Sequence, residues 1–137
     1  MKKPYKYINH TADLGIEVYG KTLNELFINI GKAIFETQVS GKIEAKKEIT
    51  IEIKQESHED LFIDWCRELL YEFSVHGFIP KKYEISIHNN SLTGHLCGDI
   101  FDAKRHKMRL EIKNPTYHDF QLKKIKKYYQ AKIIFDV

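Results

Sequence analysis

The sequence YINHTADLGIEV, residues 7–18, decides how this chain is organised. From Leu14 to Val18 every second residue is a large apolar one, which is the period-2 pattern of a half-buried strand. His10 and Asp13 stand just ahead of that strand, where a rigid element can hold polar groups in place for chemistry. An Asp that flanks a strand more often satisfies local backbone donors in a turn, so position alone assigns Asp13 no function.

The composition predicts one folded domain. A chain of 137 residues, 42% hydrophobic and 30% charged, can bury an ordinary core, so we expect a single domain over residues 1–137. The first five residues are too polar for a signal peptide, and no apolar run approaches the roughly 18 residues that a membrane helix needs. We therefore expect a cytoplasmic protein with no membrane partner.

Cysteine content and charge restrict the kinds of site. Cys66 and Cys97 are the only cysteines and form no Cys-x-x-Cys pair, so we expect buried thiols rather than a zinc site or a disulfide scaffold. The net charge of +3 is too small to establish nucleic-acid binding, although Lys123–Lys127 forms a dense basic cluster.

Hydrophobic periodicity predicts the elements. Thr22 and Glu25 form a capping box at a helix start, Ser57 is expected to cap a second helix, and Gly77 is placed to end it. In chain order, we expect strands over 5–8 and 14–19, a helix from 22 to near Ser40-Gly41, a strand over 49–54, a helix from 57 to 77, and strands over 83–87, 92–96, 108–112, 120–122 and 129–135.

This order, ββαβα followed by about five strands, predicts an α+β fold. The two helices each carry an apolar face, which we expect to pack on a largely antiparallel, multi-stranded sheet arrangement. Asn89-Asn90-Ser91 is expected to form the turn of a hairpin, and Asn114-Pro115 to interrupt the strands near the end of the chain.

Three polar residues in the second half of the chain are candidates for chemistry. Asp99 and Asp102 are three residues apart and could ligate a cation, but they fall between two expected strands, where Asp is a common turn former. His106 could be a base or a ligand, whereas a lone His at a strand start is usually solvated.

Lys113 follows the expected strand 108–112 and precedes the loop Asn114–His118. A Lys at that place can hold a phosphate as a point charge, and the alternative is an ordinary solvated side chain. The residues leave both interpretations open.

Asp136 is unusual because it lies next to Val137, whose terminal carboxylate puts two anions side by side. Such anions are tolerated if they are solvated or bridged by a cation, and hard oxygen ligands suit calcium or magnesium rather than zinc. If the last strand pairs with the first region, Asp13 adds another carboxylate to the same place. The alternative is that Val137 frays into water.

Several motifs occur together in a characteristic order. They are Tyr7–Ile16, Gly20–Phe27, Gly98-Asp99, Glu111–Lys113, Thr116–His118 and the terminal Phe135-Asp136-Val137. In this combination, from about Tyr5 to Val137, the chain resembles the archease family. The opening His-Thr-Ala-Asp and the terminal Asp-hydrophobic pair are the most specific of these motifs.

The resemblance implies a function. Archeases are accessory factors of the GTP-dependent RNA ligase of tRNA splicing: they promote ligase guanylylation and multiple turnover and are not themselves the catalyst. The resemblance also implies a divalent cation, usually calcium with magnesium as the alternative, near Asp13, Asp136 and Val137. It places Lys113 in the functional set as a phosphate or ligase contact, and it implies that tRNA is contacted only indirectly or weakly.

The chain departs from the family pattern at two places. Asp99 stands where the family usually has Glu, which keeps the charge. Asn114-Pro115 replaces small and aliphatic residues, and the rigid, donor-less Pro puts the local geometry beside Lys113 in question.

Two other classes of function stay open. One is a stand-alone metal-dependent phosphoester hydrolase that uses His10, Asp13 and His106. The other is an RNA-binding or chaperone-like module acting through Lys123–Lys127, whose affinity for RNA would fall steeply with salt.

Overall fold

The computed structural model describes residues 4–8 and 12–137. The elements in chain order are β1 (Tyr5–Ile8), β2 (Leu14–Gly20), α1 (Leu23–Gln38), β3 (Val39–Ser40), β4 (Lys47–Lys54), α2 (His58–His76), β5 (Phe78–His88), β6 (Ser91–Ile100), β7 (Lys107–Met108), β8 (Asn114–Ile125) and β9 (Tyr128–Asp136). The α+β class is confirmed, and the expected elements occur in the expected order, with the short strand β3 between α1 and β4 as an addition that was not expected.

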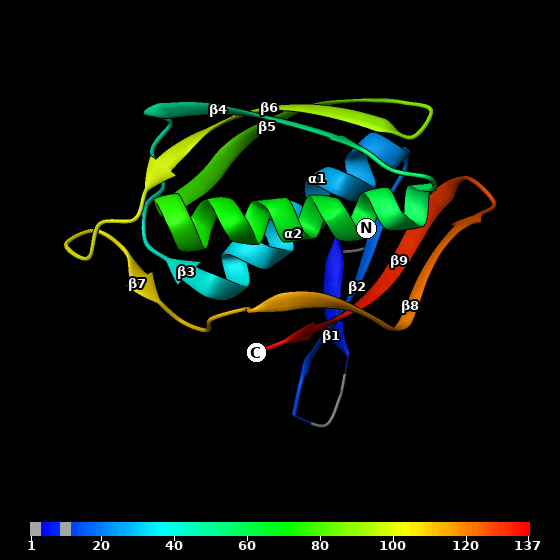
Figure 1. Cartoon of the computed structure of the whole chain (residues 1–137). Helices are drawn as coiled ribbons and strands as arrows, with labels where there is room; N and C mark the ends of the chain where they lie inside the picture. The colour runs from blue at the N-terminus through cyan, green and yellow to red at the C-terminus, as the bar shows by residue number, and fades with distance from the viewer. Residues whose placement is uncertain (1–3, 9–11) are drawn as a thin grey trace.

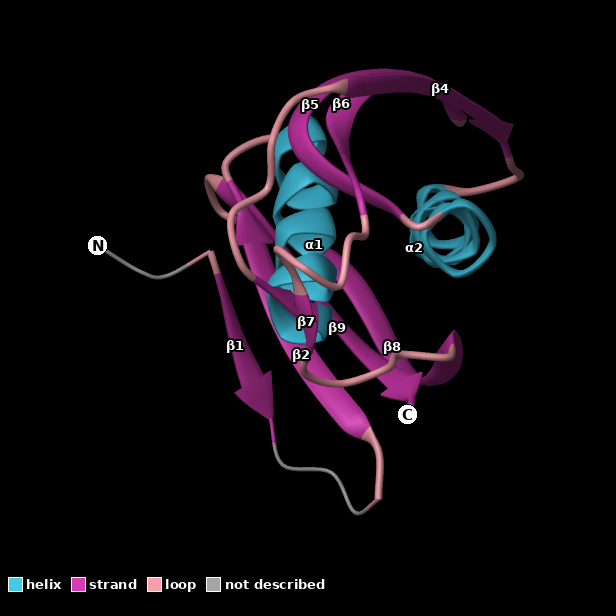
Figure 2. Ribbon diagram, turned by 90° about the vertical axis from the view of Figure 1, so that its left-hand side faces the viewer, coloured by secondary structure: helices cyan, strands magenta, loops and turns pink. Residues whose placement is uncertain are grey.

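The strands form two larger sheets with the helices between them (Figures 1 and 2). One sheet has the order β1-β2-β9-β8, the other has the order β4-β6-β5, and β3 pairs with β7 as a short separate ladder. Each of these pairings is antiparallel. Placing the helices in the middle lets their apolar faces and one face of each sheet share a core.

The helix ends follow the expected capping chemistry. The Thr22 hydroxyl accepts from the Glu25 amide at 3.1 Å, and the Ser57 hydroxyl accepts from the Asp60 amide at 3.1 Å. Gly77 ends α2 with φ of 71°, a left-handed conformation in which glycine is favoured because it has no Cβ.

The core is centred on Trp65 of α2, which is fully buried. Its Nε1 donates to the carbonyl of Phe27 in α1 at 2.9 Å, so the one polar atom of the ring is satisfied as the helices pack. The ring also covers Gly94 of β6, where an added Cβ would come within 3.2 Å of it. Of the two cysteines, Cys66 is buried as expected, burial raises the pKa of its thiol, and Cys97 is only half-buried.

The stretch after β7 differs from the expectation. A strand over 108–112 was expected, but β7 is only Lys107–Met108. The backbone amides of this stretch bond to α1 instead of to a neighbouring strand. The Arg109 amide donates to the Gln38 carbonyl at 2.7 Å, and the Ile112 amide donates to the Gln38 side-chain oxygen at 3.0 Å. Gln38 is also where α1 ends, two residues before the expected stop.

β8 is longer than expected, because Asn114-Pro115 begins a strand rather than interrupting one. Pro115 pairs with Phe135 of β9, and a Pro is tolerated there because β8 is at the edge of its sheet. The register shifts between Thr116 and Gln121, and Asp119 within this irregular part has a positive φ of 53°.

Candidate functional site

The β2–β9 ladder brings the two ends of the chain together. Leu14 pairs with Phe135 in the last pair of this ladder, so Asp13 and Asp136 each lie one residue beyond it, at the same end. The pairing of the last strand with the first region, on which a shared carboxylate site depends, is therefore confirmed.

Lys113 joins the same corner of the molecule through its backbone. Its amide donates to the Asp136 carbonyl at 2.8 Å, and the next residue, Asn114, pairs with Asp136 across β8 and β9. The Lys113 side chain is exposed and stands on irregular backbone rather than at the end of a strand. We refer to Asp13, Asp136 and Lys113 as the strand-end site.

Burial differs within the strand-end site. Asp13 is half-buried, Asp136 is exposed, and Val137 is 38% exposed. Oxygen ligands of this kind fit a hard cation such as calcium or magnesium, which takes six or more ligands and accepts water among them. Over residues 4–8 and 12–137, however, no group of three or more His, Cys, Asp or Glu side chains is arranged to hold a metal.

Asp99 belongs to a separate and saturated cluster. Its carboxylate accepts two bonds from Arg105, at 2.8 and 3.1 Å, and one each from the amides of Glu44 and Ile100, both at 2.9 Å. Asp99 is 2% exposed and lies within β6, not in a connection between strands as expected. The Arg105 hydrogen bonds and the two amides hold the pKa of Asp99 well below its usual range, although burial alone would raise it.

The oxygens of Asp99 are occupied, and the cluster is a hydrogen-bonded ion pair between a buried carboxylate and a half-buried Arg105. Arg105 also contacts Asp102, at 3.4 Å, and Glu44, at 3.1 Å. The arrangement stabilises the connection between β6 and β7 and favours a structural role over cation binding for Asp99 and Asp102.

His106 is buried, and the expectation of a solvated side chain is wrong. Its Nδ1 accepts from the Asp102 amide at 3.0 Å, so Nε2 carries the proton and lies 2.9 Å from the Lys42 carbonyl. Both ring nitrogens are thus used in holding the loop. His10, the other histidine considered for catalysis, lies outside the described residues.

Residues 15–22, GIEVYGKT, match the letters of a phosphate-binding loop. In the structure β2 runs through Gly20, and its residues pair with β1 and β9 on either side. A phosphate-binding loop needs amides that converge on the phosphate, whereas these lie in an extended ladder. The letter match therefore forms no such loop.

The basic cluster Lys123–Lys127 lies at the tip of the β8–β9 hairpin. Its four lysines are exposed, whereas Tyr128 and Tyr129 are half-buried. The Tyr128 ring contacts Tyr19 with centroids 6.1 Å apart, and Lys124 lies over the Tyr129 ring at 5.6 Å. These rings are engaged within the fold, which weakens the case for stacking on RNA bases.

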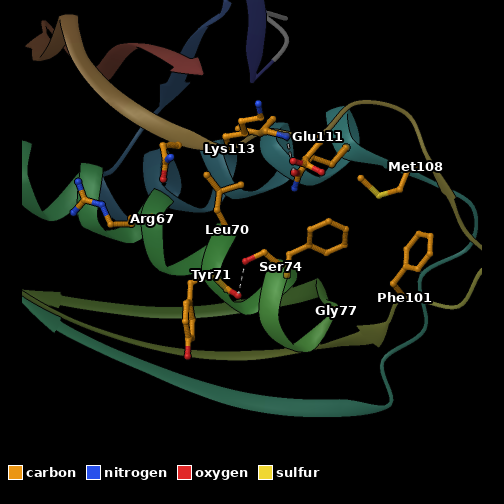
Figure 3. A pocket seen from close by; sticks show the side chains of 13 residues that line it. Arg67, Leu70, Tyr71, Ser74, Gly77, Phe101, Met108, Glu111 and Lys113 are labelled. Atoms are coloured by element: carbon orange, nitrogen blue, oxygen red, sulfur yellow. Dashed lines mark hydrogen bonds between the residues drawn. The ribbon is translucent and has the colours of Figure 1, made fainter. Parts of the chain in front are cut away.

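A hollow of about 610 Å³ lies between α2 and the stretch 108–114. We call it the α2 hollow. In Figure 3, Lys113 and Glu111 lie on one wall, Leu70 and Ser74 of α2 on the other, and Arg67 and Met108 toward opposite ends. The remaining lining residues are Gln38, Tyr71, Phe73, Gly77, Phe101, Ile112 and Asn114. Of these residues the sequence proposed a binding role only for Lys113, because the hollow is assembled from segments far apart in the chain.

Comparison with known proteins gives a consistent result. The model of the archease protein family (MTH1598/TM1083) matches residues 5–137. A curated relative named protein archease from Pyrococcus furiosus is 34% identical over 90% of each chain, and one from Archaeoglobus fulgidus is 34% identical over 97% of this chain and 98% of its own.

Two solved structures share the fold. The solution structure of protein 1598 from Methanobacterium thermoautotrophicum is 29% identical with a TM-score of 0.83, over 98% of this chain and 99% of its own. A crystal structure from Thermotoga maritima, described as an archease and possible chaperone, is 26% identical with a TM-score of 0.68, over 100% of this chain and 98% of its own. None of the described helices is long and apolar enough to cross a membrane.

Proposed function

This chain belongs to the archease family, and from that premise we propose that it is an accessory protein of the GTP-dependent RNA ligase of tRNA splicing. In this role it promotes guanylylation of the ligase and its multiple turnover, and the ligase supplies the catalytic groups. We place the protein in the cytoplasm with this partner, where it contacts tRNA only indirectly or weakly.

The observation that supports the proposal is the β2–β9 ladder, which ends next to Asp13 and Asp136, together with the bond from the Lys113 amide to the Asp136 carbonyl. Neighbouring carboxylates are tolerated when they are solvated or bridged by a cation, and an exposed Lys nearby offers a positive charge to phosphate. Groups of this kind help nucleotidyl transfer by electrostatic placement of phosphates.

We further propose that Asp13, Asp136 and the carboxylate of Val137 hold a divalent cation, calcium or magnesium. When bound, the cation neutralises phosphate charge at the surface that meets the ligase. These residues would supply part of the oxygen shell that such a cation takes. Asp13 and Asp136 orient the cation, and Lys113 contacts phosphate or the ligase.

The experiment is a ligation assay with purified ligase, GTP, divalent cation and RNA with cut ends. The wild-type protein should allow many ligations per ligase molecule, whereas Asp136→Ala should leave the ligase near a single turnover. Asp119→Asn is a matched control, because Asp119 is exposed on the same sheet and Asn tolerates its left-handed backbone. If a folded Asp136→Ala protein supports full turnover, the strand-end site has no part in the function.

The hydrolase alternative finds little support in the described residues. His106 is buried and uses both ring nitrogens within the fold, so it is not placed to act on a substrate with Asp13. The RNA-binding or chaperone-like alternative keeps one supporting observation, the exposed lysines at the β8–β9 tip. Charge reversal of these lysines with the strand-end site intact would separate it from ligase activation.

A further inference from the structure

Gln38 forms part of the α2 hollow and has one group that the fold does not use. The residue is fully buried, and its Oε1 accepts from the Ile112 amide at 3.0 Å. A backbone amide can only donate, so the side-chain oxygen must face Ile112 and the side-chain NH₂ must point elsewhere. Among the described residues, Nε2 of Gln38 is a buried polar atom without a hydrogen-bond partner.

An unsatisfied buried donor is costly, and native proteins seldom keep one without a reason. Gln38 lines the hollow but is 0% exposed, so an oxygen atom that enters the hollow can accept from this NH₂ once the wall shifts to admit it. The occupant of the hollow should therefore carry an acceptor oxygen that reaches its buried side.

The charges that line the hollow favour an acidic occupant. Arg67 and Lys113 are both exposed, and Arg67 has only a loose ion pair with Asp64 at 3.9 Å. Glu111 is the one acidic residue among the described residues that line the hollow. The cationic and amide groups of the hollow together offer more hydrogen-bond donors than acceptors. A carboxylate, which only accepts, complements this lining.

The walls favour an occupant with an apolar side chain. Leu70 is buried behind the hollow, and Tyr71 and Met108 are 50% and 40% exposed at its edge. Tyr, Met and Arg are the residue types that protein interfaces prefer, and the volume of about 610 Å³ accommodates a few side chains.

The outer face of α2 argues against nucleic acid as the occupant. Asp64, Glu68 and Glu72 follow one another at helical spacing next to the hollow. Burial, and after it the charges of Asp64 and Glu72, raises the pKa of Glu68, and the three carboxylates put negative charge along this side of the helix. A chain of phosphates would be repelled along this face, whereas a single carboxylate between Arg67 and Lys113 would not.

We propose that the α2 hollow binds an extended segment of a partner protein, which inserts an apolar side chain and an adjacent carboxylate. An oxygen of the segment accepts from Nε2 of Gln38, and the carboxylate lies near Arg67 and Lys113. The inference rests on the proposed function in taking the RNA ligase as that partner. Because Lys113 belongs to both places, the segment would hold the ligase against the strand-end site.

The first test measures the Kd for the purified ligase by calorimetry. Met108→Glu puts a negative charge at the edge of the hollow and should weaken binding about tenfold, and Arg67→Glu should weaken it about fivefold. Val75→Glu is the matched control: Val75 is on α2 and 57% exposed but does not line the hollow, so its Kd should stay within about twofold.

The outcomes separate this inference from the proposed function. A wild-type protein that neither binds nor stimulates the ligase would overturn the proposed function itself. A wild-type protein that does both, with Met108→Glu and Arg67→Glu binding as tightly as Val75→Glu, would overturn only the inference about the hollow.

A second test identifies the occupant. A photoreactive benzophenone side chain at position 108 should crosslink to one ligase segment that contains an apolar residue next to Asp or Glu, which peptide mass spectrometry would identify. A crosslink to RNA, or none while the complex is intact, would overturn the proposal.

Discussion

Asp99 and Asp136 both lie at the end of a strand, yet the fold surrounds them differently. Asp99 is 2% exposed and receives two bonds from Arg105 and two from backbone amides. Asp136 is exposed at the end of β9, one residue beyond the last pair with β2. The difference teaches that a buried acid whose oxygens are filled by its own chain stabilises the fold, whereas an exposed acid at a strand end is accessible to a ligand.

The largest effect should come from breaking the filled cluster. Arg105→Met leaves the Asp99 carboxylate buried without its cation and should lower the free energy of unfolding by about 3 kcal/mol. Arg67→Met is the matched control, because its ion pair is exposed and loose, and should change stability by less than about 0.5 kcal/mol. Urea denaturation of both variants measures this, and equal effects would show that the cluster is not structural.

Acid should act through the same cluster. Because the folded-state pKa of Asp99 lies below its unfolded value of about 3.9, its contribution to stability is present above that pH and is lost as pH falls below it. Wild type should therefore exceed Asp99→Asn in stability by a constant margin from pH 7 to about pH 4, and the margin should narrow in stronger acid. A margin that stays constant down to pH 2 would contradict this assignment.

Calcium should act through the other region. At ten times its Kd, calcium should raise the free energy of unfolding of the wild-type protein by about 1.4 kcal/mol, because it binds only the folded chain. Asp136→Asn should remove this gain, and Asp119→Asn should keep it. Thermal melts with and without calcium measure the effect, and an equal gain in all three proteins would place the ion elsewhere.

The smallest effect should be that of Asp136→Asn without metal. Because Asp136 is exposed at the end of its strand, the substitution should change stability by less than about 0.5 kcal/mol. Asp99→Asn should lower stability by more than this. Urea denaturation of Asp136→Asn and Asp99→Asn in the presence of chelator measures both effects. A loss of several kcal/mol in the free energy of unfolding of Asp136→Asn would contradict the difference between the two acids.

Local chemistry made much of the fold predictable. Thr22 and Ser57 cap their helices and Gly77 ends α2, because these contacts involve residues only a few positions apart. Asn89-Asn90 joins β5 to β6 as expected, with Asn89 at a positive φ of 55°. Alternation also located β2 and β9, from whose pairing the strand-end site follows.

Long-range polar contacts could not be predicted. The backbone of 109–113 loses its strand because Gln38, some seventy positions earlier, supplies both acceptors. His106 is buried because Lys42 accepts from it across a similar separation. No local sequence pattern indicates such distant partners. The α2 hollow depends on Gln38, so it could not be predicted from the sequence either.

The irregular outer edge of β8 has a consequence for how copies of the chain behave together. Pro115 offers no amide, the pairing with β9 is broken between Thr116 and Gln121, and Asp119 turns the backbone away from the strand direction. A strand from a second molecule would find no continuous row of donors and acceptors on which to add. At the opposite edge β1 is only four residues long. Both borders of this sheet thus discourage the addition of a strand from a second molecule.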